Sequence, residues 1–359
     1  IDMAGFSVSR CGSFNEMFAR CRNLVSVDIS GWNVPRLTRS LSLFTGSTQL
    51  RTVNMSDWTA SRLPGMSGLF GGLMNLQKVN LTNLSAPSMS NMSSLFENCA
   101  NLQEVQLAGL DAPQLANLSK MFYDCTELHT VTLTGLETPA LVNISDMFAG
   151  CNSLASVDLS NWTVESLTSV RNMLADCVSL RTADLSNWTA PRLTDASSLF
   201  SGCSTLTTLN MPKLNAPVLN NISGIFDSCS RLETVNLSGW TLPRISSLEG
   251  LFAGRSSLVE VDLSYWNAPA ITNLDTMFYN CMNLTKADFS NWATEINIQR
   301  AVNTFSGCEK LGALDMTAFN TRNATTLQDM LAGCESLRSV TLSQHFMFRG
   351  GGLVDSRQW

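Results

Sequence analysis

The sequence predicts an α/β solenoid, in which each repeat supplies one short parallel strand and one short helix and about twelve repeats stack. Three observations predict this fold. A leucine recurs at a fixed interval along most of the 359-residue chain. Apolar residues keep the same places between one leucine and the next, and a turn-forming residue follows the strand-like stretch in most repeats. An internal repeat of this length indicates stacked units that share one continuous core.

The recurring leucine defines position 0 of each repeat, which we call a rung. The position-0 residues are Leu24, Leu50, Leu76, Leu102, Leu128, Leu154, Leu180, Leu206, Leu232, Leu258, Leu284, Leu311 and Leu337. Their spacing is 26 except between Leu284 and Leu311, where it is 27. The chain therefore divides into a partial N-terminal rung at 1–23, a leucine-rich-repeat solenoid at 24–342, and a non-repeat C-terminal tail or linker at 343–359.

The first part of each rung alternates in polarity. In the first full rung, Val27 and Ile29 flank Asp28, and Trp32 follows at position 8. A period of two predicts a short strand whose residues at positions 3 and 5 point inward. The pattern matches the leucine-rich-repeat template L-x-x-L-x-L-x-x-N, with Trp or Leu at the usual Asn. Gly, Asn or Asp at position 7 predicts a left-handed backbone where the chain leaves the strand.

The second part of each rung follows a connection that carries Pro at position 11 in eight rungs. Proline excludes a strand or helix interior there. Apolar residues then come at positions 16, 19, 20 and 23, which are Leu118, Met121, Phe122 and Cys125 in one rung. Spacings of three, four and seven predict a helix of about two turns, with Ser119 as a candidate N-cap.

These strings resemble a known family. The pattern L-x-x-V-D-L-S-x-W followed by M-F-x-x-C-x-x-L is similar to the BspA-like leucine-rich repeats of bacterial and protist surface proteins. The likeness covers residues from about 14 to 342 and is closest at 158–162, 184–188 and 288–292. The resemblance implies a cell-surface role in adhesion or host interaction, and it implies no catalytic site.

Ten of the eleven cysteines share position 23 or its equivalent. A disulfide chain is disfavoured because side chains stacked from rung to rung point in parallel. A row of metal ions bound by these cysteines is disfavoured because structural metal sites need converging pairs of ligands. The sequence therefore predicts a row of buried, mostly free thiols and no metal or cofactor.

Position 4 is polar in every rung and points out of the strand onto the expected concave face. Two groups of carboxylates fall there on adjacent rungs, namely Asp158 with Asp184, and Asp262 with Asp288 and Asp315. One interpretation is a weak site for calcium or a polyhydroxyl ligand. The other is a row of hydrogen-bonded polar side chains that gives the open sheet a hydrophilic surface.

Several functional classes are disfavoured. The two histidines lie in different repeat phases, and the chain has no nucleophile or phosphate-binding motif, so no enzyme is expected. A net charge of −6 disfavours nucleic-acid binding. No apolar run is as long as a membrane span requires.

Few lysines and many Ser, Thr and Asn favour an extracellular, cell-surface or virion-surface location. Because Ile1 is not an initiator methionine, the sequence is expected to belong to a longer polypeptide.

Two functions remain open. The first is a surface protein that binds a host or extracellular protein or a glycan. The second is a structural subunit of an extracellular filament, sheath or phage appendage that self-associates through the solenoid ends. Phe346, Phe348 and Trp359 are the candidate assembly residues, since they leave the repeat pattern as exposed apolar side chains.

Overall fold

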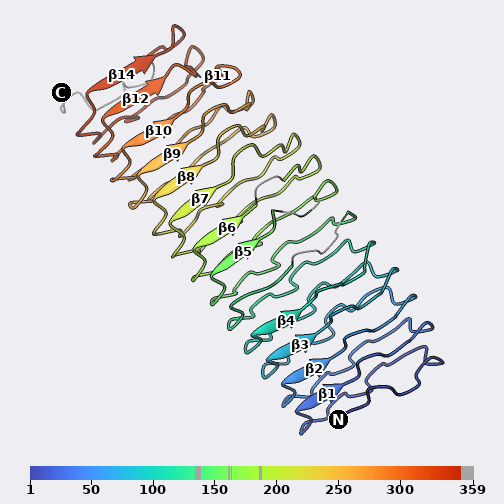
Figure 1. The fold of residues 1–359 in the computed structure, drawn as a ribbon. Helices are drawn as coiled ribbons and strands as arrows, with labels where there is room; N and C mark the ends of the chain where they lie inside the picture. Colours follow the sequence, from blue (N-terminus) through green and yellow to red (C-terminus); the bar gives the residue numbers. More distant parts are fainter. Residues whose placement is uncertain (134–138, 161, 163, 186–187, 349–359) are drawn as a thin grey trace. The chain divides into compact units, whose positions relative to one another are not determined.

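The computed structural model describes residues 1–133, 139–160, 162, 164–185 and 188–348. The chain forms two compact units, Ile1–Ala183 and Asp184–Trp359. Each unit is a solenoid of short parallel strands connected by turns (Figure 1). The predicted repeat architecture is therefore confirmed, with about twelve turns along the whole chain.

The strands of the first unit follow the repeat. The sheet runs in the order β1 (Ser26–Asp28), β2 (Thr52–Asn54), β3 (Lys78–Asn80) and β4 (Glu104–Gln106). Each residue pairs with its equivalent in the next rung, for example Val27 with Val53. Further along is β5 (Ser156–Asp158), and the boundary between the two units falls within β6 (Thr182–Asp184). Side chains at one position of the repeat are therefore stacked directly on one another.

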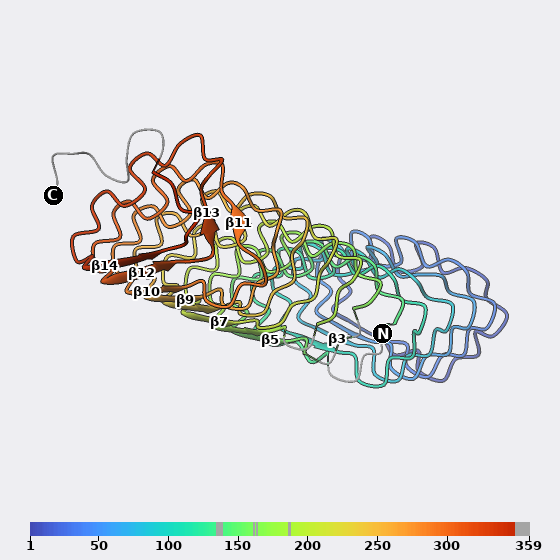
Figure 2. The same ribbon diagram turned by 90° about the horizontal axis from the view of Figure 1, so that it is seen from above.

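The second unit repeats this arrangement. Its main sheet contains β7 (Thr208–Asn210), β8 (Thr234–Asn236), β9 (Glu260–Asp262) and β10 (Lys286–Asp288). Beyond them β12 (Ala313–Met316) pairs with β14 (Ser339–Leu342), and β11 (Ile296–Asn297) pairs with β13 (Phe319–Asn320). Figure 2 shows β11 and β13 on a different side of the turns from the row of the other strands.

The inward positions form ladders of like side chains. In the first unit, Phe96, Phe122 and Phe148 stack with ring centroids 5.4 Å apart and rings nearly parallel. In the second unit, Trp240, Trp266 and Trp292 stack at 5.8 and 5.6 Å. Offset aromatic stacking adds to the free energy that burial alone provides. These ladders confirm the predicted inward positions.

The predicted short helix is wrong. Among the described residues the chain contains no helix, and the segment after the connection is a pair of tight turns. Lys120 and Asp124 adopt φ angles of +55°, which a helix does not allow. The predicted inward set is nevertheless correct, because Leu118, Phe122 and Cys125 are at most 1 % exposed.

The hydrogen bonds explain why turns replace the helix. The N–H groups of Met121 and Cys125 donate to the carbonyl three residues before, whereas those of Lys120, Phe122 and Asp124 donate to the next rung. A backbone that gives alternate donors to its neighbour cannot also complete an i→i−4 ladder. Stacking therefore competes with the helix for the same donors, and the stacked ladder is formed.

The predicted N-cap, Ser119, and its equivalents in other rungs take part in a different motif. The N–H of Ser119 donates to Oδ1 of Asn117 at 2.9 Å, and Ser93, Ser145 and Ser223 repeat this contact with the Asn two residues before. This is an Asx-turn, in which the side chain imitates a backbone turn. These asparagines also bridge neighbouring rungs, for example Asn91 with Asn117. The predicted left-handed residues at position 7 are confirmed, for example Gly31 and Asp57 at φ +70° and +58°.

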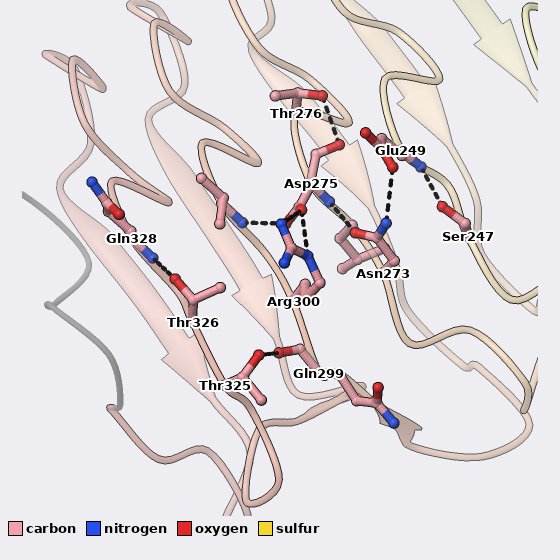
Figure 3. A network of polar contacts seen from close by, with 12 residues as sticks. Ser247, Glu249, Asn273, Asp275, Thr276, Gln299, Arg300, Thr325, Thr326 and Gln328 are labelled. Carbon is pink, nitrogen blue, oxygen red and sulfur yellow. Dashed lines mark hydrogen bonds and ion pairs between the residues drawn. The ribbon is translucent and has the colours of Figure 1, made fainter.

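The longer rung, 284–310, is held by an ion pair. Arg300 bridges Asn273 and Thr326, which restores the register after the extra residue. Its guanidinium contacts Asp275 Oδ2 through Nε at 2.7 Å and Nη2 at 2.6 Å (Figure 3). The N–H of Val302 donates to Oδ1 of the same carboxylate at 2.7 Å. Asp275, whose side chain is 9 % exposed, is thereby fully paired.

Candidate functional site

The position-4 residues form one polar row, which we call the open strand face. In the first unit the row begins with Asp28, Asn54, Asn80 and Gln106. Oδ1 of the first three residues accepts the N–H two residues later, at 3.0–3.2 Å. These Asx-turns end each strand and use one side-chain oxygen of each residue. All four residues are half-buried, and Gln106 Nε2 donates to Glu104 Oε1 at 2.6 Å.

A hollow of about 570 Å³ lies over β1–β4. Its wall includes the four residues of this row together with Lys78. None of the aspartates predicted to bind a ligand lines this hollow, so the site was not predicted from the sequence. The available signal was the unbroken succession of Asp, Asn, Asn and Gln at position 4 of neighbouring rungs. The hollow offers amide, carboxylate and ammonium groups side by side, which suits a polar ligand.

Two charged side chains that line the hollow, Lys78 and Asp28, are paired within the protein. Lys78 Nζ lies 3.0 Å from Glu104 Oε2, and its hydrogen bond lowers the pKa of Glu104. Asn54 Nδ2 donates to Asp28 Oδ2 at 3.0 Å. Burial alone would raise the pKa of Asp28, but the hydrogen bonds from Ser30 and Asn54 outweigh it, so the pKa is lowered. Both carboxylates are therefore ionised at neutral pH.

The predicted ligand-binding aspartates occupy the expected row. Asp262 and Asp288 are direct register partners on β9 and β10, and Asp315 lies in β12 of the same unit. Asp158 ends β5 in the first unit, and Asp184 begins the second unit. The structure therefore brings Asp262 and Asp288 together.

Hydrogen bonds also stabilise the charged form of two of these aspartates, Asp158 and Asp288. Ser160 donates its N–H and its hydroxyl to Asp158 Oδ1, and these bonds lower the pKa of Asp158. For Asp288, burial alone would raise the pKa, but bonds from Ser290 and Lys286 lower it overall. Within the described part of the chain, no three His, Cys, Asp or Glu side chains converge as metal ligands would. The second interpretation, a hydrogen-bonded row, accounts for the contacts that these aspartates make.

The ten cysteines at position 23 form no disulfide and eight of them are buried, as the sequence predicts for most of this row; the two near its ends, Cys21 and Cys334, are half-buried. In the first unit, the Sγ–H of Cys99, Cys125, Cys151 and Cys177 donates to a phenylalanine carbonyl of the preceding rung, at 3.1 Å. Ser47 makes the same bond with its hydroxyl. Burial raises the pKa of Cys99 and Cys177 to about 12. A thiol held protonated in this way is a poor nucleophile.

We expect at most three of the eleven thiols to react with Ellman's reagent in the folded protein at pH 8. Cys11, Cys21 and Cys334 are half-buried, and the other eight are buried. Absorbance at 412 nm should rise to the full eleven equivalents only after denaturation in guanidinium chloride. Rapid modification of more than three thiols in the native state would contradict the buried thiol row.

The candidate assembly residues lie beyond the last strand. Phe348 is 62 % exposed and its ring lies 5.5 Å from that of the half-buried Phe346, while Trp359 lies outside the described residues. The chain between these rings still contacts the rung before it, because the Met347 N–H donates to the Thr321 hydroxyl, which in turn donates to the Met347 carbonyl. His345 takes the place of the expected Trp, and its Nδ1 lies 2.6 Å from Glu295 Oε2.

Comparison with solved structures shows the fold. A leucine-rich repeat protein from Bacteroides ovatus ATCC 8483 is similar over 92 % of this chain and 76 % of that chain, with a TM-score of 0.50 and 15 % sequence identity. An internalin from Listeria monocytogenes strain 4b F2365 aligns over 90 % of this chain and 82 % of that chain, with a TM-score of 0.33 and 14 % identity. No curated protein matches the sequence. Among the described residues, no helix is present that could cross a membrane.

A family model covers nearly the whole chain. The model described as "Mycoplasma protein of unknown function, DUF285" matches residues 12–130, 90–213 and 220–344. These matches contain the strings that resemble BspA-like repeats, and the structure shows the leucine-rich-repeat solenoid that such repeats imply. The chain therefore belongs to the DUF285 family of BspA-like leucine-rich-repeat proteins.

Proposed function

We propose that this chain is a non-enzymatic binding module of an extracellular or cell-surface protein. Its open strand face would recognise a host or extracellular protein or a glycan, and the binding would serve adhesion. The observation that carries the proposal is the hollow over β1–β4. Solenoids of this kind present extended surfaces on which successive repeats contribute equivalent side chains.

The chemistry of the hollow supports recognition by hydrogen bonding. Asn80 Oδ1 accepts the Thr82 N–H and Gln106 Nε2 donates to Glu104, so the Asn80 amide N–H groups and the Gln106 carbonyl are the atoms left for a ligand, and Lys78 and Glu104 supply opposite charges nearby. The described residues that line it include no aromatic side chain. Tight protein interfaces usually centre on buried Trp, Tyr or Arg. A polar partner that contacts several rungs is therefore favoured over a partner that inserts a single apolar side chain.

An array of extracellular proteins and glycans tests the proposal. The variant Lys78→Ala/Asn80→Ala/Gln106→Ala is expected to lose binding to any partner that the parent chain captures. The control is Gln114→Ala/Ser166→Ala, which changes residues of the connections in the same unit. Equal binding by the two variants would show that the open strand face is not the binding surface.

The second function is a structural subunit that assembles through its ends. The exposed ring of Phe348, packed against Phe346, supports it, because apolar surface of this kind favours self-association. Light scattering after size-exclusion chromatography at rising concentration separates the two functions. Assembly predicts a mass that grows with concentration and returns to the monomer in Phe346→Ser/Phe348→Ser. A strictly monomeric parent chain would exclude assembly.

A further inference from the structure

Charge is unevenly distributed along the chain. The segment 1–80 contains eight Arg and Lys and four Asp and Glu, which is a net charge of +4. The segment 81–359 contains fifteen Arg and Lys and twenty-five Asp and Glu, which is a net charge of −10. The whole-chain value of −6 therefore conceals a basic N-terminal region. A basic surface on an acidic protein points to a specific anionic partner.

Three of these arginines occupy one structural place in consecutive rungs. Arg10, Arg36 and Arg62 are each the third residue of a four-residue turn. The turns are closed by hydrogen bonds from Cys11 to Val8, from Leu37 to Val34 and from Leu63 to Ala60, at 2.9–3.1 Å.

The three turns are stacked in register. The N–H of Thr38 donates to the carbonyl of Gly12, and Asn33 forms a parallel bridge with Thr59. Neighbouring strands of a sheet lie about 4.8 Å apart, so three guanidinium groups emerge in a line with about that repeat. All three side chains are exposed.

The line of arginines has no countercharge on its own surface. The connections 7–13, 33–39 and 59–65 contain Arg10, Arg36, Arg39 and Arg62 and no Asp or Glu. The ion pairs among the described residues involve none of these four arginines. Like charges on neighbouring strands repel. The next two rungs avoid this repulsion with Ser88 and Gln114 at the same place.

We propose that Arg10, Arg36 and Arg62, with the exposed Arg39 beside them, form an arginine strip that binds a linear acidic polysaccharide. The guanidinium fork binds sulfate and carboxylate groups through paired hydrogen bonds. A polymer with one anionic group per sugar repeats its charge at about the length of a sugar ring, which is close to the spacing of the rungs. The strip lies on a surface other than the open strand face, and it goes beyond the proposed function.

The same segments disfavour two other polyanions. Single-stranded nucleic acid is usually held by aromatic side chains on which bases stack, and the three connections contain no Phe, Tyr or Trp. Binding in a membrane surface needs apolar side chains that can enter the lipid. Val34, Leu37 and Leu63, the large apolar residues of the second and third connections, are buried in the solenoid. At the first connection Val8 is half-buried and Phe6, which precedes it, is exposed, so exposed apolar surface is confined to one end of the strip.

The test compares two variants of the full chain that each remove three positive charges. The strip variant is Arg10→Gln/Arg36→Gln/Arg62→Gln. The control is Arg192→Gln/Arg244→Gln/Arg322→Gln, whose exposed arginines lie in the second unit and do not occupy adjacent rungs. Calorimetric titration with heparin gives the affinity, and thermal unfolding reports whether each variant is folded. The same titration with dextran, single-stranded DNA and phosphatidylserine vesicles defines the class of partner.

We expect the strip variant to bind heparin about tenfold or more weakly than the parent chain. The heparin affinity of the control should stay within about twofold of the parent value. The strip variant should unfold at the same temperature as the parent or higher, because it removes repulsion. Equal weakening in both variants, or in neither, would overturn the proposal. So would strip-dependent binding of DNA or vesicles as tight as that of heparin. The open-face variant Lys78→Ala/Asn80→Ala/Gln106→Ala should keep the parent heparin affinity, so the two sites are tested separately.

Discussion

Replacement of Phe122 by alanine is expected to lower the free energy of unfolding of the first unit by about 3–5 kcal/mol. The ring is fully buried and stacks on Phe96 and on Phe148, each at 5.4 Å. Truncation leaves a cavity between two rings that the stacked backbone holds in register, so the neighbouring rungs cannot close it. Urea unfolding followed by circular dichroism measures the loss.

The matched control is Asp158→Ala on the open strand face of the same unit. Asp158 is exposed and its carboxylate bonds within its own Asx-turn, so we expect a loss of about 1 kcal/mol or less. The Phe122 variant should also react faster with Ellman's reagent than the Asp158 variant, because a less stable unit opens more often and exposes its buried thiols. Similar losses of stability in the two variants would mean that the inward and outward assignments are wrong.

Replacement of Arg300 by alanine should destabilise the second unit by about 1.5–3 kcal/mol. The Asp275 carboxylate would lose its bonds to Arg300 and keep the one from the Val302 N–H. A buried carboxylate without its cation lowers the free energy of unfolding, because its charge is no longer compensated. The effect should be confined to the rungs around the longer repeat. Urea unfolding gives its size, and amide hydrogen exchange gives its location.

Arg322→Ala serves as the control for charge. Arg322 is an exposed arginine of the next rung and forms none of the ion pairs found among the described residues. Its removal should change the free energy of unfolding by about 0.5 kcal/mol or less. In the double variant Asp275→Asn/Arg300→Ala, the loss should be smaller than the sum of the two single losses, because the uncompensated carboxylate is gone. Strict additivity would show that the pair does not couple the two rungs.

The cysteine row could be predicted from the sequence, whereas the hollow and the arginine strip were not. The cysteine row was predictable, since one phase of the repeat holds ten thiols and parallel side chains cannot form bridges. The hollow over β1–β4 was not predicted, because neighbouring rungs were compared for carboxylates alone and three of the four residues in this row are amides. The arginine strip was concealed in the same way, since Arg10, Arg36 and Arg62 are each a whole repeat apart in the sequence.

The sequence by itself determined the period of the repeat, the inward positions and the left-handed exits such as Gly31, because burial and turn chemistry act on each residue locally. Only the tertiary structure decided the conformation of the second segment. Its apolar spacing fits a helix and a pair of tight turns equally well, as Leu118 and Phe122 are buried in either case. The choice depends on where the N–H groups find acceptors, and the neighbouring rung offers carbonyls that an isolated repeat does not have.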